Sequence, residues 1–567
     1  MKKTEVIHLY TEEGERLQGT PWNVYPRPQL RRDSFFCLNG EWRFLANDGM
    51  WETIRVPFPP ESLLSGICRD MGKRPILAYR KSFKLPEGFV RDRVLLHFGA
   101  VDQIARITLN GHFLGEHRGG YEAFCFDITD ALADDNLLEV VVTDEMNTHV
   151  LPYGKQRRDH GGMWYTPVTG IWQTVWCESV SRDYIRALRI ITDANGARIV
   201  AEGVDGGTVT VTTPDGEHRF PLAQGVAHIR LEHPRLWSPE DPYLYDFTVT
   251  AGEDEVRSYF ALRTLSVETV DGIPRLCLNG KPYFFHGLLD QGYFSDGIYM
   301  PATPSGFLFD ILSMKELGFN MLRKHIKIEP DLFYYFCDKH GMLVFQDMVN
   351  SGKYNYLLDT VLPTLGKRRG IIHKASKLRR ETFERDARAT VDLLYNHPSV
   401  IYYTIFNEGW GQYDADRIYT ELKNYDSTRV CDATSGWFAE QKSDVVSEHI
   451  YFKKINLKES SERPLVLSEF GGYSCKIEGH SFNLDKTYGY KFFNTTDAFG
   501  TALERLYRDE VIPMTERGLC ATVLTQVSDV EDETNGLLTY DRQVLKIDME
   551  RMKQISARIY QEFESSI

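Results

Sequence analysis

The first 180 residues alternate short runs of β-branched and aromatic residues with turn residues. Runs such as VLLHFGA, ARITLNGHFLGEH and LLEVVVTD have the length and composition of β-strands. Asn110-Gly111 stands between two such runs and is a strong signal for a β-hairpin. The pattern predicts an all-β first domain over residues 1–182.

Short strand-like runs continue over residues 183–265, for example RIITDANGARIVAE and TVTVTTPDGEHRF. They are separated by glycine and Pro-Asp-Gly turns. The length of this segment suits one small β-sandwich, which predicts a second domain of immunoglobulin-like size.

The pattern changes at about residue 266, where strand-like and helix-like segments begin to alternate. Strands are expected to start near residues 282, 320, 342, 400, 429, 445, 464 and 521, with helices over 305–318, 330–340 and 373–396. Eight strand-helix units predict a (β/α)8 barrel over residues 266–567. The helices after the fifth and sixth strands are expected to be short.

Composition fits a soluble multidomain protein, because 567 residues are too many for one hydrophobic core. Hydrophobic residues make up 42% of the chain and charged residues 26%. Aromatic residues reach 13%. That content suits binding to the apolar faces of sugars, and equally suits β-sandwich packing.

Charge and cysteine usage narrow the possible partners. The net charge of −14 would repel phosphate backbones and anionic membranes, which argues against nucleic-acid or membrane binding. Nine cysteines without a CxxC pair argue against a disulfide framework or a zinc site and favour a reducing compartment. The N-terminus does not resemble a signal peptide, and no run of 18 apolar residues occurs. We therefore expect a cytoplasmic protein.

Two strand-like runs in the second half of the chain each end in a glutamate. VIYYTIFNE ends at Glu408, and PLVLSE ends at Glu469. A parallel barrel places its chemistry at the carboxyl ends of its strands, and the fourth and seventh strands face each other across the barrel. Hydrolysis of a glycosidic bond needs two carboxyl groups beside one sugar. Either glutamate alone would be interpreted as an ordinary strand-end acid, whereas the pair predicts a glycosidase site.

The two glutamates suit a retaining mechanism, with Glu408 as general acid and base and Glu469 as nucleophile, about 5–5.5 Å apart. Asn407 can donate its amide to the sugar 2-hydroxyl, a contact that strengthens in the transition state. Tyr451 follows the sixth strand and can donate to the Glu469 carboxylate, although a core tyrosine is an equal interpretation.

Other strand-end residues are further candidates for the site. Arg323 ends the second strand, where it would pair with a catalytic carboxylate or form a structural ion pair. Three histidines at strand ends lack HxH or HExxH spacing, which favours sugar contacts or core positions over a metal: His286, His325 and His449. Residues just beyond the first, fourth, fifth and eighth strands could bind hydroxyls, stack on rings or pack in loops: Asp290, Gln291, Trp410, Trp437 and Asp529.

Taken together, the segments YPRPQLRRDSFFCLNGEWRF, NGHFLGEHRGGYEAFCFDIT, TGIWQTVWCE, LWSPEDPYLY, YFALRT, LNGKPYFFHG, GFNMLRKH, NHPSVIYYTIFNE and LVLSEFGG resemble glycoside hydrolase family 2. The resemblance covers nearly the whole chain. It implies a jelly-roll sugar-binding-like domain, an immunoglobulin-like β-sandwich and a (β/α)8 catalytic barrel. It also implies retaining exo-hydrolysis without a cofactor, and a possible homo-oligomer. Glu408, Asn407, Glu469, Tyr451 and Arg323 fall on the family's functional positions.

The chain departs from the family around the terminal sugar. Relatives that cleave glucuronides have an Asn-x-Lys pair where this chain has Glu533-Thr534-Asn535, and a glutamate there would repel a uronate. Ile326 replaces a histidine that is frequent after the second strand, and Thr525 replaces the tryptophan that is usual at the end of the eighth.

The sequence therefore predicts a retaining exo-glycosidase that removes a terminal neutral sugar from β-glycosides, with β-galactosidase favoured on family frequency. An α-L-arabinosidase or a β-mannosidase is the alternative within the family. A carbohydrate-binding protein without activity is a third hypothesis, which the two intact carboxyl residues disfavour.

Overall fold

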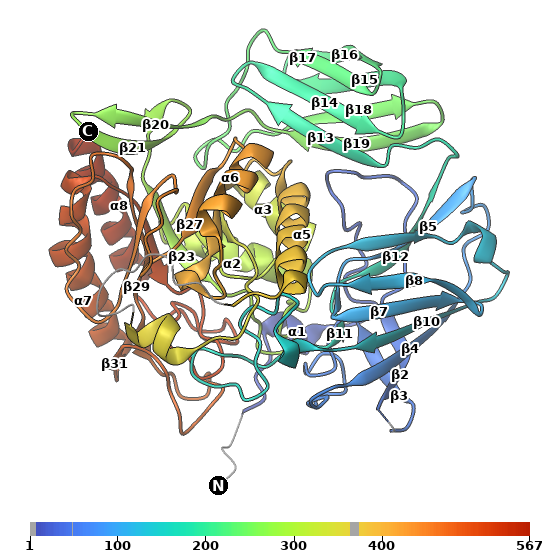
Figure 1. Cartoon of the computed structure of the whole chain (residues 1–567), viewed down its shortest axis with the longest axis horizontal. Coiled ribbons are helices and arrows are strands. Elements are labelled where there is room, and N and C mark those ends of the chain that lie inside the picture. Colours follow the sequence, from blue (N-terminus) through green and yellow to red (C-terminus); the bar gives the residue numbers. More distant parts are fainter. Residues whose placement is uncertain (1–6, 48, 363–373) are drawn as a thin grey trace.

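The computed structural model describes residues 7–47, 49–362 and 374–567. Residues 1–6, 48 and 363–373 lie outside this part, including the first residue of the helix predicted over 373–396. Three bodies are visible in Figure 1: a β-sandwich at the right, a smaller β-domain at the top, and a barrel at the left. Their strands occupy residues 36–180, 187–260 and 285–525. The predicted fold class is confirmed, whereas the exact domain boundaries stay a prediction.

The first domain packs two antiparallel sheets face to face. One has the order β3-β2-β4-β10-β7-β8, and the other β1-β12-β5-β9. Alternate residues of β10 are buried, among them Val140 and Val142, so one face of the strand enters the core. The elements are α1 Glu12–Arg16, β1 Phe36–Cys37, β2 Gly40–Ala46, β3 Glu52–Val56, β4 Ile76–Phe83, β5 Arg93–Phe98, β6 Val101–Asp102, β7 Ile104–Leu109, β8 His112–Arg118, β9 Phe124–Asp127, β10 Asn136–Thr143, β11 Gly170–Ile171 and β12 Val175–Val180.

The hairpin predicted at Asn110-Gly111 connects β7 and β8. Leu109 pairs with His112, so these two residues form the whole turn. Asn110 has φ 52° and Gly111 has φ 83°, as a two-residue turn between twisted strands requires.

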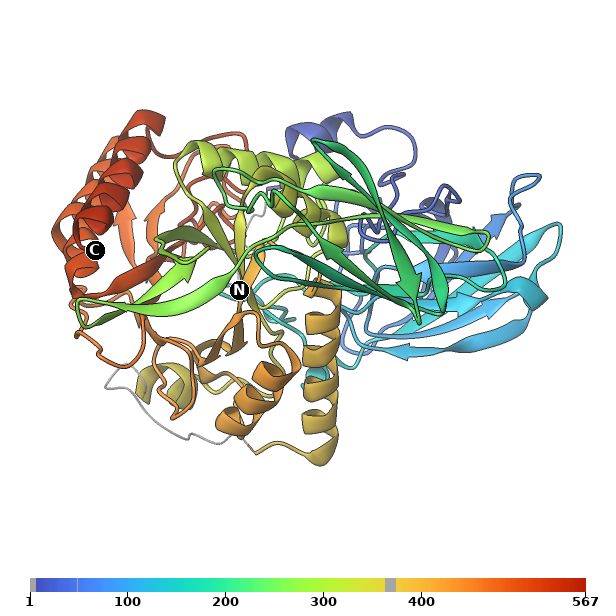
Figure 2. The same cartoon turned by 90° about the horizontal axis from the view of Figure 1, so that it is seen from above.

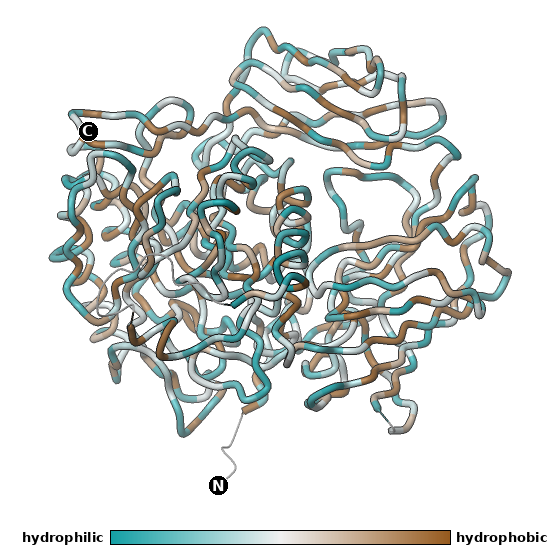
Figure 3. The backbone as a smooth tube through the Cα atoms, in the orientation of Figure 1, coloured by the Kyte–Doolittle hydropathy of each residue, from teal (hydrophilic) through white to brown (hydrophobic). Residues whose placement is uncertain are grey.

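The second domain is a seven-stranded antiparallel ladder with the order β13-β14-β17-β16-β15-β18-β19. It surrounds its own core, which includes Ile199, Val209 and Phe247. Figure 3 shows hydrophobic and hydrophilic residues alternating along its strands. The strands are β13 Ala187–Thr192, β14 Gly196–Glu202, β15 Gly206–Thr213, β16 Gly216–Ala223, β17 Val226–Arg230, β18 Tyr245–Ala251 and β19 Asp254–Phe260.

The third domain is a parallel barrel with the strand order β27-β26-β25-β24-β23-β32-β29-β28. Every residue of β26 and of β32 is buried, because these strands face side chains inside the barrel and helices outside it. The strands are β23 Phe285–Asp290, β24 Met321–Lys324, β25 Leu343–Asp347, β26 Val400–Phe406, β27 Val430–Thr434, β28 Val446–Ile450, β29 Leu465–Gly471 and β32 Leu519–Thr525. Each begins within a few residues of its predicted start.

Additional strands surround the barrel. A small sheet leads into it, formed by β20 Leu265–Val270, β21 Ile273–Leu278 and β22 Lys281–Pro282. Two short parallel strands follow β29, namely β30 Tyr473–Cys475 and β31 Lys491–Phe493.

In the described part of the barrel, the covering α-helices are α2 Pro304–Glu316, α3 Asp331–His340, α5 Lys377–Leu394, α6 Ala415–Tyr425, α7 Thr496–Leu506 and α8 Met549–Ser565. The prediction of short helices after the fifth and sixth strands is wrong. Residues 435–445 and 451–464 are all described, and they contain no helix. The first of these segments is too short for a helical crossover. Of the second, only Ile455 and Leu457 are buried hydrophobic residues, too few for a helix face.

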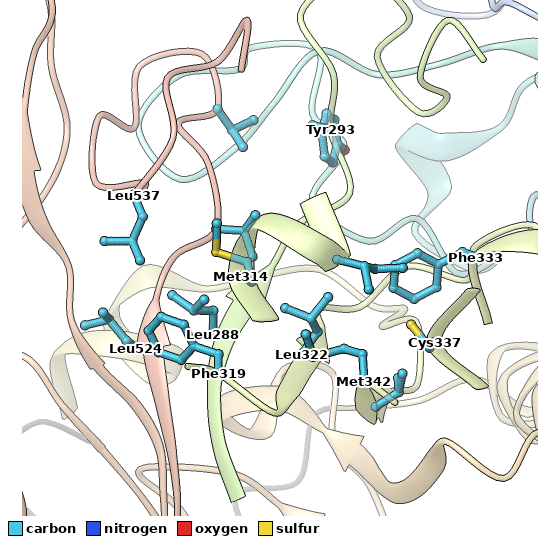
Figure 4. Close-up of a cluster of buried hydrophobic side chains, with 14 of the residues drawn as sticks. Leu288, Tyr293, Met314, Phe319, Leu322, Phe333, Cys337, Met342, Leu524 and Leu537 are labelled. Atoms are coloured by element: carbon cyan, nitrogen blue, oxygen red, sulfur yellow. The ribbon is translucent and has the colours of Figure 1, made fainter. Parts of the chain in front are cut away.

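The barrel core is continuous from its strands to the surrounding helices. Figure 4 shows Leu288 and Leu322, from neighbouring strands, beside Met314 of α2. The same cluster extends into the first domain through residues such as Trp22, Phe58 and Trp172. Figure 2 shows the first domain beside the barrel along the longest axis. None of the helices in the described ranges is both long and apolar enough to cross a bilayer.

Candidate active site

Glu408 and Glu469 meet over the barrel. Glu408 lies in a short turn just after β26, and Glu469 lies near the end of β29; they are 7% and 4% exposed. His449 of β28 lies between them, with Nδ1 at 2.9 Å from Glu408 Oε1 and 3.4 Å from Glu469 Oε2. One ligand atom from each of the three residues lies within 4.8 Å of the others. This spacing suits a retaining pair, since inverting pairs stand about 6.5–9.5 Å apart.

The backbone at Glu408 is held in an uncommon conformation. Glu408 has φ 50° and ψ 25°, in the left-handed region that non-glycine residues rarely adopt. Its N–H donates to Ser435 Oγ at 3.2 Å. Backbone strain of this kind persists where surrounding contacts hold it, and it concentrates at functional sites.

Arg323 of β24 is the electrostatic centre of the site. Its guanidinium is 1% exposed and donates to Glu469 Oε1 at 3.1 Å and to Asp347 Oδ1 at 3.0 Å. It also donates to Asn407 Oδ1 at 2.9 Å and to the Ser468 carbonyl at 2.9 Å. The planar guanidinium thereby fixes three strand ends relative to one another.

The contact between Arg323 and His449 determines the histidine tautomer. Arg323 Nη1 lies 3.2 Å from His449 Nε2, and a guanidinium can only donate, so Nε2 accepts. Burial lowers the pKa of His449 to about 3, so the ring is neutral. The hydrogen therefore lies on Nδ1, which donates to Glu408.

The two glutamates have pKa values above the ordinary range. Burial raises the pKa of Glu408 to about 7, although Lys155 and Arg323 act to lower it. Burial also raises the pKa of Glu469, where His449 and Arg323 act against the rise and Glu408 adds to it. A group with pKa near 7 suits a general acid at neutral pH.

Tyr451 contacts the nucleophile candidate Glu469, and Asn407 contacts Arg323. Tyr451 donates to Glu469 Oε2 at 2.6 Å and lies 2.7 Å from Thr525 Oγ1. Asn407 uses its carbonyl oxygen to accept from Arg323 and Ser435. Within the described part of the chain its Nδ2 has no acceptor, which leaves it able to donate to a sugar hydroxyl.

Asp347 belongs to the site but was not predicted. It ends β25, and it accepts from Arg323 and, at 2.9 Å, from His325 Nδ1. Burial acts to raise the pKa of Asp347, but Arg323 and His325 lower it to about 2. Asp347 is a polar residue at the end of a predicted strand, so the rule that selected Glu408 would also have selected it.

The two predicted tryptophans have different surroundings. Trp410 is buried under the first domain, where its ring stacks on Trp164 with centroids 5.3 Å apart. Lys155 Nζ, also from the first domain, lies 5.0 Å over the same ring. Trp437 is half-buried and donates from Nε1 to the His449 carbonyl at 3.1 Å. Trp437 therefore lies beside the site, whereas Trp410 forms part of a domain contact.

Four predicted residues have no contact with either glutamate among the described residues. Asp290 binds Lys324, and Asp529 binds Lys546, each with 2.6 Å between nitrogen and oxygen. Gln291 is buried at 4% exposure. His286 packs on Phe319 with ring centroids 4.4 Å apart, a satisfied core position. Sugar contacts of Asp290, Gln291 and Asp529 stay predictions.

The loop 144–169 of the first domain, between β10 and β11, crosses the mouth of the barrel. His160 Nδ1 lies 2.9 Å from Glu531 Oε2, and the Thr166 N–H donates to Glu531 Oε1 at 2.8 Å. Tyr165 donates to Glu533, which is 4% exposed. The loop contains one short 3-10 helix, Met146–Thr148, and loops of this length are often functional.

Glu408, His449 and Glu469 are close enough together to be considered as metal ligands. However, Nδ1 of His449 carries the hydrogen, because Nε2 accepts from Arg323. A protonated ring nitrogen cannot bind a metal ion, so this group suits proton transfer better than ligation.

The sequence of the barrel matches a known protein family. Residues 270–559 match the profile "Glycosyl hydrolases family 2, TIM barrel domain". The chain belongs to glycosyl hydrolases family 2. Residues 71–186 match the family's galactose-binding domain-like profile, and residues 189–263 match a further family 2 profile.

Curated proteins with two different names are similar to this chain. A β-galactosidase of Thermoanaerobacter pseudethanolicus is 26% identical over 55% of this chain and 44% of its own length. A β-glucuronidase of Bacteroides fragilis is 25% identical over 65% of this chain and 56% of its own length. The chain thus spans about half the length of these curated relatives.

Two solved structures share the fold. The β-D-glucuronidase of Dictyoglomus thermophilum has a TM-score of 0.74 at 19% identity, covering 94% of this chain and 98% of its own. The β-galacturonidase of Eisenbergiella tayi bound to galacturonate has a TM-score of 0.68 at 18% identity, covering 94% and 99%.

Proposed function

We propose that the protein is a retaining exo-glycosidase that acts by double displacement. The observation that carries this is the convergence of Glu408 and Glu469 beside one buried histidine. Glu469 attacks the anomeric carbon while Glu408 protonates the departing oxygen, so the glycosidic bond breaks and a glycosyl-enzyme ester forms. Glu408 then takes a proton from water, the water oxygen attacks the anomeric carbon, and the ester bond to Glu469 breaks.

The surrounding contacts fit these roles. Arg323 and Tyr451 donate to the two oxygens of Glu469, which holds it ionised and oriented for attack. Glu408 receives one hydrogen bond from His449, and burial favours its protonated form. Hydrogen bonds thus favour the ionised form more strongly at Glu469 than at Glu408, as the mechanism requires.

Substitution of the nucleophile tests this proposal. We expect Glu469→Gln to reduce hydrolysis of an activated aryl glycoside to background, and azide to restore turnover to Glu469→Gly by replacing the carboxylate. The matched control is Glu478→Gln, which removes an exposed acid from the next loop. Wild-type turnover by Glu469→Gln would contradict the proposal.

For the terminal sugar we propose a neutral hexose, with a β-galactoside first. The site already contains four carboxyl residues, Glu408, Glu469, Asp347 and Glu533, against two cations, Arg323 and Lys155. A uronate would add another negative charge to a cluster that is already short of cations. The similarity to a β-galactosidase supports the same choice.

A uronate is the second candidate, and one observation favours it. Lys155 has no carboxylate within ion-pair distance in the described residues, and relatives named β-glucuronidase are similar to the chain. A panel of nitrophenyl glycosides separates the candidates, including arabinoside and mannoside. Sugar binding without hydrolysis across that panel would favour a non-catalytic carbohydrate-binding protein.

A further inference from the structure

Lys155 is a buried cation of the first domain that lies over the barrel. It lies in the loop 144–169, where its carbonyl accepts from the Tyr165 N–H at 3.0 Å. The adjacent Gln156 anchors this strand of the loop by donating to Asp102 Oδ2 at 2.9 Å. The Lys155 side chain is 7% exposed, and its position is therefore fixed by the loop and by packing.

The ammonium group of Lys155 has no acceptor among residues 7–47, 49–362 and 374–567. The Lys155 ammonium lies over the Trp410 ring, with 5.0 Å between Nζ and the ring centroid. A buried charge without a hydrogen-bonding partner is costly, and such groups are normally paired. Lys155 Nζ is not among the fully enclosed polar atoms, so the ammonium borders open space in which a ligand oxygen can accept from it.

Lys155 faces the reacting end of the site. Its charge acts on Glu408, lowering a pKa that burial raises, and on Glu533 in the same direction. Trp410, which lies under the ammonium, follows Glu408 by one glycine. The ammonium therefore lies on the side of the site that the first domain forms, within electrostatic range of Glu408, Glu533 and His325.

Glu533 offers an acceptor within electrostatic range of this donor, beyond ion-pair distance. Its Oε2 accepts from Tyr165 and, at 3.2 Å, from Gln526 Nε2. Its Oε1 accepts no hydrogen bond from the described part of the chain. Tyr165 belongs to the same loop as Lys155, so one loop positions both the cation and the acid.

We propose that Lys155 and Glu533 form a hydroxyl-binding pair for the terminal sugar, in which the ammonium donates and the free carboxylate oxygen accepts. This rests on the proposed glycosidase function and specifies its substrate class. A donor and an acceptor of opposite charge together bind hydroxyl groups without adding net charge. The same pair disfavours a uronate, because Glu533 repels the carboxylate that Lys155 would attract.

The test compares wild type, Lys155→Met and Glu533→Gln with p-nitrophenyl β-D-galactoside and its 3-, 4- and 6-deoxy analogues. A hydrogen bond from a charged group predicts that Lys155→Met lowers kcat/KM on the parent sugar about 10- to 100-fold. On the analogue that lacks the bound hydroxyl, the two proteins should differ by less than about twofold. Arg157→Met, which removes an exposed charge from the same loop, is the control and should match wild type.

Binding measurements distinguish a failure of the Lys155–Glu533 pair from a failure of the proposed function. Calorimetry of D-galactose with Glu469→Gln protein should show binding that Lys155→Met weakens about tenfold or more. Lys155 forms no hydrogen bond within the described residues, so Lys155→Met should melt at a temperature no lower than that of wild type. If Lys155→Met does not fold, Glu533→Gln takes its place in the test. If wild type binds D-galactose in this way but hydrolyses no glycoside, the proposed function is wrong and the hydroxyl-binding pair still stands.

Three results would overturn the pair itself. The first is equal kcat/KM for Lys155→Met and wild type on the parent galactoside. The second is an equal loss on every deoxy analogue, which indicates a structural role. The third is a wild-type preference for p-nitrophenyl β-D-glucuronide or galacturonide that Lys155→Met abolishes, which would make Lys155 a carboxylate-binding residue.

Discussion

At the residue scale, two chemically identical side chains have different environments. Glu469 receives hydrogen bonds from Arg323 and Tyr451, while Glu408 receives one from neutral His449. The first set stabilises an ionised carboxylate, whereas burial stabilises the protonated form of Glu408 although Lys155 and Arg323 act against it. Because the groups interact, they titrate as a pair.

The pH dependence of activity follows from these environments. The kcat/KM of wild type should fall as pH rises through about 7, because Glu408 then loses the proton that it must donate. It should also fall at low pH, as Glu469 becomes protonated above the ordinary glutamate range. The measurement is a pH–rate profile on an aryl glycoside.

Glu408→Gln gives the control for this profile. Its rate on substrates with poor leaving groups should drop about 10²- to 10⁴-fold, and the basic limb should disappear. A basic limb that persists near pH 7 in Glu408→Gln would assign that titration to another group.

At the element scale, the carboxyl ends of five barrel strands supply the site. The sequence predicted Glu408, Glu469 and Arg323 there because polar residues ending buried strands stand out against apolar runs. It missed Asp347, which has the same signal, because the pair of glutamates alone satisfied the chemistry. It also named Asp290 and Asp529, which pair with buried lysines in the structure, and their sugar contacts stay predictions.

Arg323 should be the most sensitive of these strand-end residues. Arg323→Met leaves Asp347 and Glu469 without their shared cation in a buried setting, which should destabilise the fold by about 3–5 kcal/mol and abolish turnover. Arg508→Met, which removes an exposed cation, should change stability by less than about 0.5 kcal/mol. Thermal unfolding followed by circular dichroism compares the two, and equal melting temperatures would contradict the central role of Arg323.

At the scale of the whole molecule, the site is shared between two domains. The loop 144–169 brings Lys155, Trp164 and Tyr165 over the barrel, and one apolar cluster continues from the first domain into the third. Sequence patterns predicted the three domains, since periodicity is local. They gave no signal for this loop contact, because it depends on how two domains dock, which no local pattern encodes.

The shared core predicts coupled unfolding of the first domain and the barrel. Calorimetry should show them melting in one transition, because separating them would expose Trp22, Phe58 and Trp172 to water. The second domain has a core of its own and contributes Trp237 and Ala261 to a second cluster with the barrel strands. A distinct transition for the first domain, with the barrel still active, would contradict this coupling.

In the proposed mechanism, Glu469 forms a covalent bond to the sugar while Glu408 protonates the leaving group. The most direct measurement incubates the protein with a 2-deoxy-2-fluoro analogue of its best substrate and locates the trapped sugar by peptide mass spectrometry. The account predicts one sugar per chain, attached to Glu469, and a product with retained anomeric configuration. A label on another residue, or a product with inverted configuration, would contradict it.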